Sequence, residues 1–259
     1  MLRSLALGLA IATGALAGCS GTPPLLPAGN VSAGLGQATP DTPAFNPFSD
    51  RAGAEIKGRD VIANPSLEEV LKPVTDLPEM ALGRADAPVT IVQYASMTCP
   101  HCRRFHAETF PTFKKDYVDT GKVRYVLRAE FPIGKQSGLA TVALRCAAPQ
   151  KYFQLYEKLM AQQAAWVSQE VRPDPILEVA KQAGLTRAQF DACRQDEALL
   201  KKLNAIKERG RTLGVIGTPN FFVQGKLVKS VLDMKSIREL VDPLLDGRVA
   251  NNQPGSVPR

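Results

Sequence analysis

The sequence predicts an α/β fold in which a mixed central sheet is flanked by helices and interrupted by an inserted, all-helical subdomain. Three observations indicate this class. A β-branched run at residues 89–96 leads through a helical pattern to a second strand at residues 122–129. A helical block follows at about residues 137–213, and a hairpin and a final helix complete the pattern at residues 220–245. Strands at the start and a hairpin at the end imply both parallel and antiparallel pairing.

The first half of the expected sheet contains one helix between two strands. Residues 89–96 are rich in β-branched side chains, which is typical of a buried strand. Residues 103–117 carry four aromatic side chains near the helical period, and this predicts a helix with one buried face. Thr120-Gly121 ends that helix in a turn, and residues 122–129 alternate as a strand does.

Proline and glycine residues divide the rest of the chain into segments. Within the helical block we expect five helical segments, at residues 138–148, 152–163, 176–183, 186–193 and 197–213. Residues 220–223 and 226–231 then predict a hairpin around Gln224-Gly225. Asp233 caps a last helix that runs to residue 245.

The most informative feature is the cysteine pair Cys99 and Cys102 at the junction of the first strand and its helix. Pro100 suits a first helical turn, where its missing N–H costs no hydrogen bond. Cys99 therefore falls at a helix N-terminus, where unpaired N–H groups and the helix dipole stabilise an anion. We expect an exposed Cys99 thiol with a pKa well below that of a free thiol. A protonated His101 adds positive charge beside it.

Two thiols one helical turn apart are the arrangement that thiol–disulfide exchange requires. Cys99 then acts as the nucleophile, and Cys102 closes a disulfide with it. The alternatives are a structural disulfide and half of a zinc site. Zinc normally takes four ligands, but the sequence has no second close cysteine pair, and the other histidine, His106, falls on the same helix. We therefore expect a redox-active disulfide, no metal and no cofactor.

Two motifs together resemble the DsbA-like branch of the thioredoxin superfamily. One is the run Tyr-Ala-Ser-Met-Thr-Cys-Pro-His-Cys-Arg-Arg-Phe-His at residues 94–106, and the other is Gly-Thr-Pro-Asn-Phe-Phe-Val at residues 217–223. The resemblance covers about residues 82–245 and implies a thioredoxin fold with an inserted helical subdomain. It also implies that Pro219 is cis and that its loop lies against the active-site sulfurs. Thr218 and Pro219 then offer backbone groups to an extended substrate segment.

The same resemblance implies an activity and partners. The protein would donate the Cys99–Cys102 disulfide to reduced exported proteins through a mixed disulfide on Cys99, and a DsbB-like, quinone-linked membrane oxidase would restore it. His101 would tune the pKa of the Cys99 thiol. A disulfide reductase or isomerase is the alternative within this class. A thiol-based metal-binding or holdase module is the alternative outside it.

One position departs from the family pattern. Six residues before the first catalytic cysteine, relatives often carry a buried acid that exchanges protons with the second cysteine, whereas this chain has Gln93. Because an amide cannot accept that proton, the resolving step would depend on solvent or on Glu130. The position of Glu130 at the end of a strand favours a surface carboxylate.

Two further cysteines, Cys146 and Cys193, fall within the helical block. Two buried free thiols are one possibility, since free cysteine packs as a small apolar side chain. In an oxidising compartment, a pair in one subdomain more often bonds. We therefore expect a structural disulfide between them.

Residues 1–18 have the pattern of an export signal of the lipoprotein type. An apolar stretch that is short for a membrane span follows Arg3, and Leu16-Ala-Gly-Cys19 resembles a bacterial lipobox. In that motif Cys19 is lipidated and becomes the mature N-terminus. Ordinary signal cleavage after Ala17 is the alternative. Residues 19–64 would then form the lipidated N-terminus and a flexible tether rich in Pro, Gly and Ala.

The folded domain is expected over residues 65–248, opening with a capping box at residues 66–69, and residues 249–259 form a polar, disordered tail. The chain of 259 residues has a formal net charge of +7, but its basic residues are dispersed among acids. This pattern is typical of a solvated surface and gives no support to nucleic-acid binding; attraction to anionic lipid is the alternative. The leader and the cysteine usage predict a bacterial periplasmic protein anchored to a membrane through Cys19.

Overall fold

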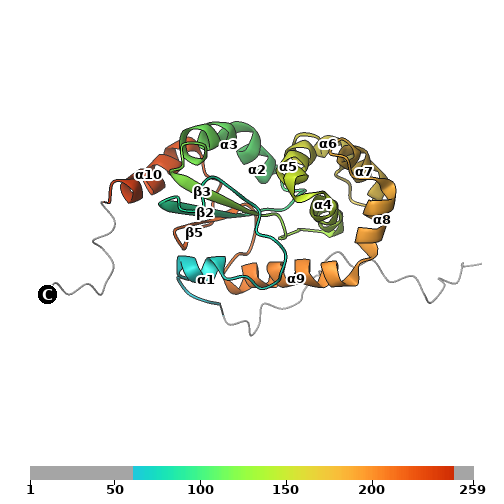
Figure 1. Ribbon diagram of the computed structural model, residues 1–259, viewed down its shortest axis with the longest axis horizontal. Coiled ribbons are helices and arrows are strands. Elements are labelled where there is room, and N and C mark those ends of the chain that lie inside the picture. The colour runs from blue at the N-terminus through green and yellow to red at the C-terminus, as the bar shows by residue number, and fades with distance from the viewer. Residues whose placement is uncertain (1–60, 248–259) are drawn as a thin grey trace, which may run out of the picture. The chain divides into compact units, whose positions relative to one another are not determined.

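The computed structural model describes residues 61–247, and within them five strands form one mixed sheet with helices on both faces (Figure 1). The strand order is β1-β3-β2-β4-β5. The central strand β2 (Val89–Tyr94) pairs parallel with β3 (Val123–Arg128) and antiparallel with β4 (Asn220–Val223). The edge strands β1 (Ala81–Leu82) and β5 (Lys226–Val228) are antiparallel to their neighbours. The predicted mixed sheet is confirmed.

The central strand β2 is buried along its whole length because both of its faces are covered. Ile91 packs in the same core cluster as Phe105, while the next residue, Val92, packs with Val70 and Leu213 on the opposite face. This alternation follows from the two-residue period of a strand. The helices that cover the two faces are, on one side, α2 (Pro100–Arg104), α3 (Phe110–Phe113) and α10 (Met234–Leu245), and on the other, α1 (Leu67–Leu71) and α9 (Glu197–Thr212) (Figure 1).

The helix that carries the cysteine motif is not the single α-helix that the sequence predicts. Two π-helical segments, η1 (Phe105–Thr109) and η2 (Lys114–Val118), separate and extend α2 and α3. Pro111 is the second residue of α3 and lies two positions after the end of η1. Proline has no N–H to donate, and its ring displaces the carbonyl of the preceding turn, so the chain widens there.

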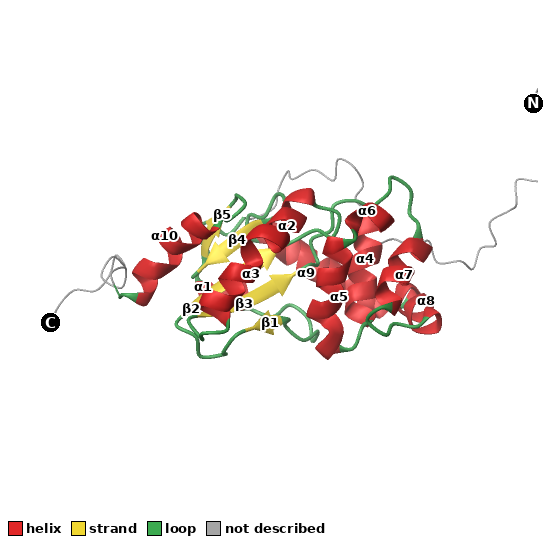
Figure 2. Cartoon of the chain, turned by 90° about the horizontal axis from the view of Figure 1, so that it is seen from above, coloured by secondary structure: helices red, strands yellow, loops and turns green. Residues whose placement is uncertain are grey.

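The helical block lies beside the sheet, and α9 leads from it back toward the last strands (Figures 1 and 2). Its elements are α4 (Lys135–Cys146), η3 (Pro149–Lys151), α5 (Tyr152–Ala161), α6 (Gln163–Trp166), α7 (Pro173–Lys181) and α8 (Arg187–Gln195). The inserted helical subdomain is therefore confirmed. Its α7 begins at Pro173 rather than at the expected residue 176, because Pro173 and Pro175 both fit the first turn of a helix.

A disulfide joins two helices of the block. Cys146 is the last residue of α4 and Cys193 lies in α8, and their sulfur atoms are bonded across a separation of 47 residues. In the chain-entropy model, closing a loop of this length constrains the unfolded chain by about 4 kcal/mol. The pairing agrees with the expected structural disulfide.

Local differences from the sequence expectations occur at both ends of the sheet. Ser66 caps α1 by accepting the N–H of Glu69, but no capping box closes, because the Glu69 carboxylate pairs with Arg209 at 2.8 Å. The edge strand β1 was not expected, since two residues carry no periodic pattern. β5 ends at Val228 instead of residue 231.

Several expectations concern residues outside the described range of 61–247. These are the export signal at residues 1–18, lipidation of Cys19, nearly all of the tether at residues 19–64, and the tail at residues 249–259. None of the helices within residues 61–247 combines the length and the hydrophobicity needed to traverse a bilayer.

Candidate active site

The loop that carries Cys99 out of β2 is held in place by the helical block. The Ser137 hydroxyl, in α4, accepts the N–H of Met97 at 3.0 Å and lies 2.8 Å from the hydroxyl of Ser96. The Gln163 side chain, at the start of α6, donates to the carbonyls of Met97 and Cys99. Both side chains are buried. The block therefore positions the loop before the cysteine motif, a role that no local sequence signal reveals.

Cys99 and Cys102 lie against the loop of Thr218 and Pro219. Both cysteines are free thiols, and the Cys99 Sγ accepts the N–H of Cys102 at 3.3 Å as the cap of α2. The Cys99 thiol in turn donates to the backbone carbonyl of Thr218 at 3.2 Å, and the Thr218–Pro219 peptide is cis. The structure thus brings together four of the site residues expected from the sequence.

The burial of the two thiols differs from expectation in one respect. Cys102 is fully buried and Cys99 is only 8% exposed, so the prediction of an exposed Cys99 is wrong. The reason is tertiary: Cys99 bonds to the backbone of a loop 119 residues away in sequence, which a local pattern cannot place. Of the two sulfur atoms, only that of Cys99 is accessible enough to meet another protein.

The environment drives the pKa values of the two thiols apart. The hydrogen bond from the Cys102 thiol lowers the pKa of Cys99 to about 5, helped by the Thr218 hydroxyl and by the backbone N–H groups of Cys102 and His101, while burial opposes the shift. Burial raises the pKa of Cys102 well above its ordinary value, and the nearby Cys99 sulfur raises it further. At neutral pH, the site therefore holds a Cys99 thiolate beside a protonated Cys102.

The side chain and the backbone of His101 have different partners. Its side chain is exposed, and its Nδ1 lies 3.4 Å from a guanidinium nitrogen of Arg104. Because an arginine can only donate, Nδ1 is the acceptor in this contact. The contribution of His101 to the lowered pKa of Cys99 comes instead from its backbone N–H.

Replacing Thr218 by valine should raise the pKa of Cys99 more than replacing His101 by alanine. The Thr218 hydroxyl is buried and, among the described residues, has no other partner, so its loss removes a hydrogen bond worth about one pKa unit. His101→Ala keeps the backbone N–H, and we expect a rise of less than about half a unit. The measurement is thiolate absorbance against pH in each reduced variant. A larger rise in His101→Ala would restore the imidazole as the tuning group.

Gln93 occupies a buried position on β2 with incomplete hydrogen bonding. Its Oε1 accepts a hydrogen bond from the Tyr125 hydroxyl, and its Nε2 has no partner within residues 61–247. Burial raises the pKa of Tyr125 well above its ordinary value, and the nearby Cys102 adds to the shift. Gln93 and Tyr125 therefore form a polar but non-ionised pair near the buried sulfur of Cys102.

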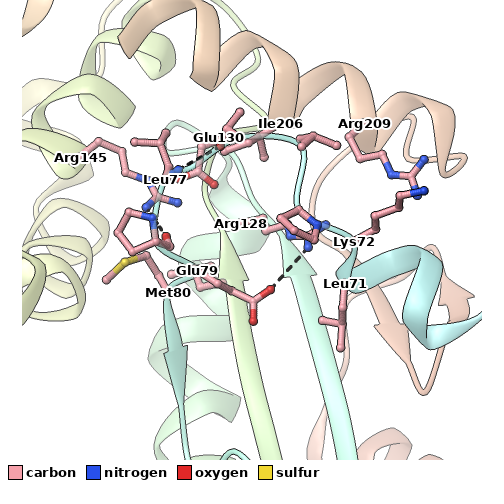
Figure 3. Close-up of a pocket in the computed structure, with 15 residues that line it drawn as sticks. Leu71, Lys72, Leu77, Glu79, Met80, Arg128, Glu130, Arg145, Ile206 and Arg209 are labelled. Atoms are coloured by element: carbon pink, nitrogen blue, oxygen red, sulfur yellow. Dashed lines mark hydrogen bonds and ion pairs between the residues drawn. The ribbon is translucent and has the colours of Figure 1, made fainter. Parts of the chain in front are cut away.

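Glu130 is fully buried, so the expectation of a surface carboxylate is wrong (Figure 3). The chain turns inward after β3, and the Glu130 Oε1 lies 2.5 Å from Nε of Arg145 and 3.3 Å from the Tyr152 hydroxyl. Its Oε2 has no partner among the described residues, and Glu130 lines a cavity of about 60 Å³ together with Arg128 and Arg209. The hydrogen bonds of Glu130 thus go to Arg145 and Tyr152 and not to the active-site sulfurs.

No group of three or more His, Cys, Asp and Glu side chains in the described part of the chain is arranged to hold a metal ion.

A family model described as Thioredoxin matches residues 75–243. The chain belongs to the thioredoxin family.

Curated relatives of this thioredoxin-family chain carry names from disulfide chemistry. A Rickettsia felis protein named "Putative protein-disulfide oxidoreductase" is 30% identical over 200 residues, covering 72% of this chain and 70% of the relative. A Rickettsia bellii protein of the same name is 31% identical over 173 residues, covering 65% of each chain. "Disulfide bond formation protein D" of Bacillus subtilis is 27% identical, covering 64% of this chain and 77% of the relative. The chain thus spans slightly less than two thirds of the Rickettsia bellii relative.

Solved structures agree on the fold. Wolbachia pipientis α-DsbA1 superposes with a TM-score of 0.63 at 24% identity, covering 73% of this chain and 100% of that chain. Oxidised BdbD from Bacillus subtilis superposes with a TM-score of 0.58 at 25% identity, covering 73% of this chain and 99% of that chain. The predicted DsbA-like thioredoxin fold is confirmed.

Proposed function

We propose that this protein is a thiol:disulfide oxidoreductase that donates the Cys99–Cys102 disulfide to reduced exported proteins. The observation that carries the proposal is the arrangement of the two thiols: a low-pKa Cys99 that lies against the cis-proline loop, backed by a buried, protonated Cys102. The names of the curated relatives support the same reaction class.

The proposed reaction is a two-electron exchange in two attacks. A substrate thiolate attacks Cys99, because Cys102 is fully buried, and the Cys99–Cys102 bond breaks as a mixed disulfide forms on Cys99. Cys102 leaves and takes up a proton, as its raised pKa favours. A second substrate thiolate then attacks the substrate sulfur, and Cys99 leaves as a thiolate. The substrate gains a disulfide, the protein gains two electrons and one proton, and the second proton goes to solvent.

The thiolate gives this exchange its direction. At pH 7, a Cys99 pKa of about 5 stabilises the reduced protein by roughly 3 kcal/mol relative to a free thiol with a pKa of about 8.5. For a two-electron couple this corresponds to about 60 mV. The stabilisation is fully present above the pKa of the free thiol and is lost as the pH falls through about 5. Donation of the disulfide is therefore favoured at neutral pH.

An equilibrium titration of Cys99–Cys102 against glutathione tests the proposal. Thioredoxin, with a thiol pKa of about 7, has a potential of about −270 mV, so a pKa of about 5 predicts a value near −220 mV. The readout is the fraction of alkylated Cys99 at each glutathione ratio. A potential at or below that of thioredoxin would contradict disulfide donation and favour a reductase.

We also propose that the protein is exported to the bacterial periplasm, is lipidated on Cys19 and is reoxidised by a DsbB-like, quinone-linked membrane oxidase. The lipobox-like residues 16–19 and the low-complexity segment after them support the anchor. Cys19→Ala should move the protein from the membrane fraction to the soluble fraction or block its processing, with the potential of Cys99–Cys102 unchanged. An intact mass that corresponds to cleavage after Ala17, with Cys19 unmodified, would contradict lipidation.

A further inference from the structure

A groove of about 470 Å³ adjoins the active site on the side of the cis-proline loop. It is lined by His101 and Arg104 of α2, by Ile216 and Thr218 of the loop, and by Lys229 after β5. Thr218 belongs to this lining, and its carbonyl oxygen lies 3.2 Å from the Cys99 Sγ, so the groove begins beside the reacting sulfur. The groove therefore receives the residues that flank the reacting cysteine of a substrate.

The charged groups in this groove are all basic. Arg104 and Lys229 are exposed, and no Asp or Glu among the described residues lines the groove. Within residues 61–247, neither Arg104 nor Lys229 forms an ion pair with a carboxylate; the guanidinium of Arg104 faces His101 instead. The acid that follows in the chain, Asp233, is engaged in capping α10 through the N–H of Ser236 at 2.7 Å. Two cations thus face the groove without a counter-charge.

The dimensions of an extended chain place the side chains next to the cysteine within reach of these cations. A strand rises about 3.3 Å per residue, so a side chain two positions from the cysteine lies on the same face about 7 Å away. Because Thr218 contacts Cys99 and lines the groove together with Arg104 and Lys229, a side chain at that distance can enter the groove. Ile216, which is 73% exposed, offers an apolar contact there. A carboxylate at this position would be attracted by Arg104 and Lys229.

We propose that Arg104 and Lys229 make the protein selective for substrates in which an acidic residue lies within two positions of the reacting cysteine. This inference rests on the proposed function and names the substrate class of the same site. The two cations do not take part in the sulfur chemistry. They determine specificity by stabilising the bound segment and its mixed disulfide on Cys99.

The test uses the oxidised full-length protein and three dithiol peptides that differ only in one residue, Asp, Asn or Lys, two positions from the first cysteine. Each oxidation rate is divided by the rate at which the same peptide reacts with hydroxyethyl disulfide. This division corrects for the effect of the Asp, Asn or Lys residue on the intrinsic reactivity of the peptide thiol. At low ionic strength, we expect the Asp peptide to react about tenfold faster than the Lys peptide. In 1 M salt, where the screening length is about 3 Å, the ratio should fall below about two.

The double variant Arg104→Gln/Lys229→Gln should remove the preference, so that the corrected rates for the Asp and Lys peptides lie within about twofold of each other. Lys201→Gln, which removes one exposed cation on α9, is the matched control and should keep the preference. Equal corrected rates for the Asp and Lys peptides in the wild type, or a preference that survives in the double variant, would overturn the inference. Failure to oxidise even the Asn peptide would overturn the proposed function, and the inference with it.

Discussion

Alkylation of Cys99 in the reduced protein should show a midpoint near pH 5. At pH 6, a thiol with that pKa is about 90% ionised, against about 0.3% for a free thiol with a pKa of about 8.5, so the thiolate fraction is about 300-fold larger. The rate rises by less, since the nucleophilicity of a thiolate falls as its pKa falls. The pH midpoint of iodoacetamide labelling, followed by mass, is therefore the proper measure.

The wild type is the right protein for this measurement because Cys102 contributes to the shift. Its thiol is the largest cause of the lowered pKa of Cys99, and its own pKa is raised, so it stays unlabelled. Cys102→Ala should move the midpoint upward while leaving it below that of a free thiol, since the Thr218 hydroxyl and the backbone donors remain. A wild-type midpoint near 8.5 would rule out the thiolate and, with it, the proposed driving force.

Replacing Arg145 by methionine should destabilise the fold by about 3–5 kcal/mol. The side chain of Arg145 is 6% exposed and that of Glu130 is fully buried, so the substitution leaves a carboxylate in the interior without its counter-charge. The arginine also donates to the carbonyl of Pro78 at 2.8 Å and lies over the ring of Tyr152. Urea unfolding monitored by circular dichroism measures the loss.

Two variants make that result specific to the buried pair. Arg84→Met removes a cation from an ion pair whose side chains are 69% and 70% exposed, and it should leave the urea midpoint almost unchanged. Replacing both members, Glu130→Leu with Arg145→Met, removes the buried charge and should recover most of the stability. A cost below 1 kcal/mol for Arg145→Met alone would mean that water reaches Glu130 through the cavity.

The sequence predicts the parts of this protein that depend on local pattern. The strands around residues 89–94 and 123–128, the helical block and the hairpin at Gln224-Gly225 all follow from periodicity and turn residues. The proximity of Cys99 to Cys102 follows from their spacing. The position of the cis-proline loop against Cys99 was predicted only from the resemblance to a family. No local rule connects Cys99 with Thr218, which lie 119 positions apart.

The remaining features depend on tertiary contacts. The burial of Cys99 is set by Thr218, and the inward position of Glu130 is set by Arg145 on a helix that the sequence could not orient. The support of the active-site loop by Ser137 and Gln163 has the same origin. A single chain shows which residues are polar, but not which of them meet.

The placement of β4 has a consequence for the order in which the protein assembles. The chain leaves the sheet at residue 128 and returns at residue 220, and the cysteine motif meets the cis-proline loop only after this excursion has closed. The bond between Cys146 and Cys193 bypasses 47 residues of it, about half of its length, which lowers the entropic cost of closure by about 0.6 kcal/mol. Contacts within the helical block and the β2–β3 pair span shorter stretches of chain and are expected to form first. The reactive centre is therefore completed late, when the two distant halves of the sheet have joined.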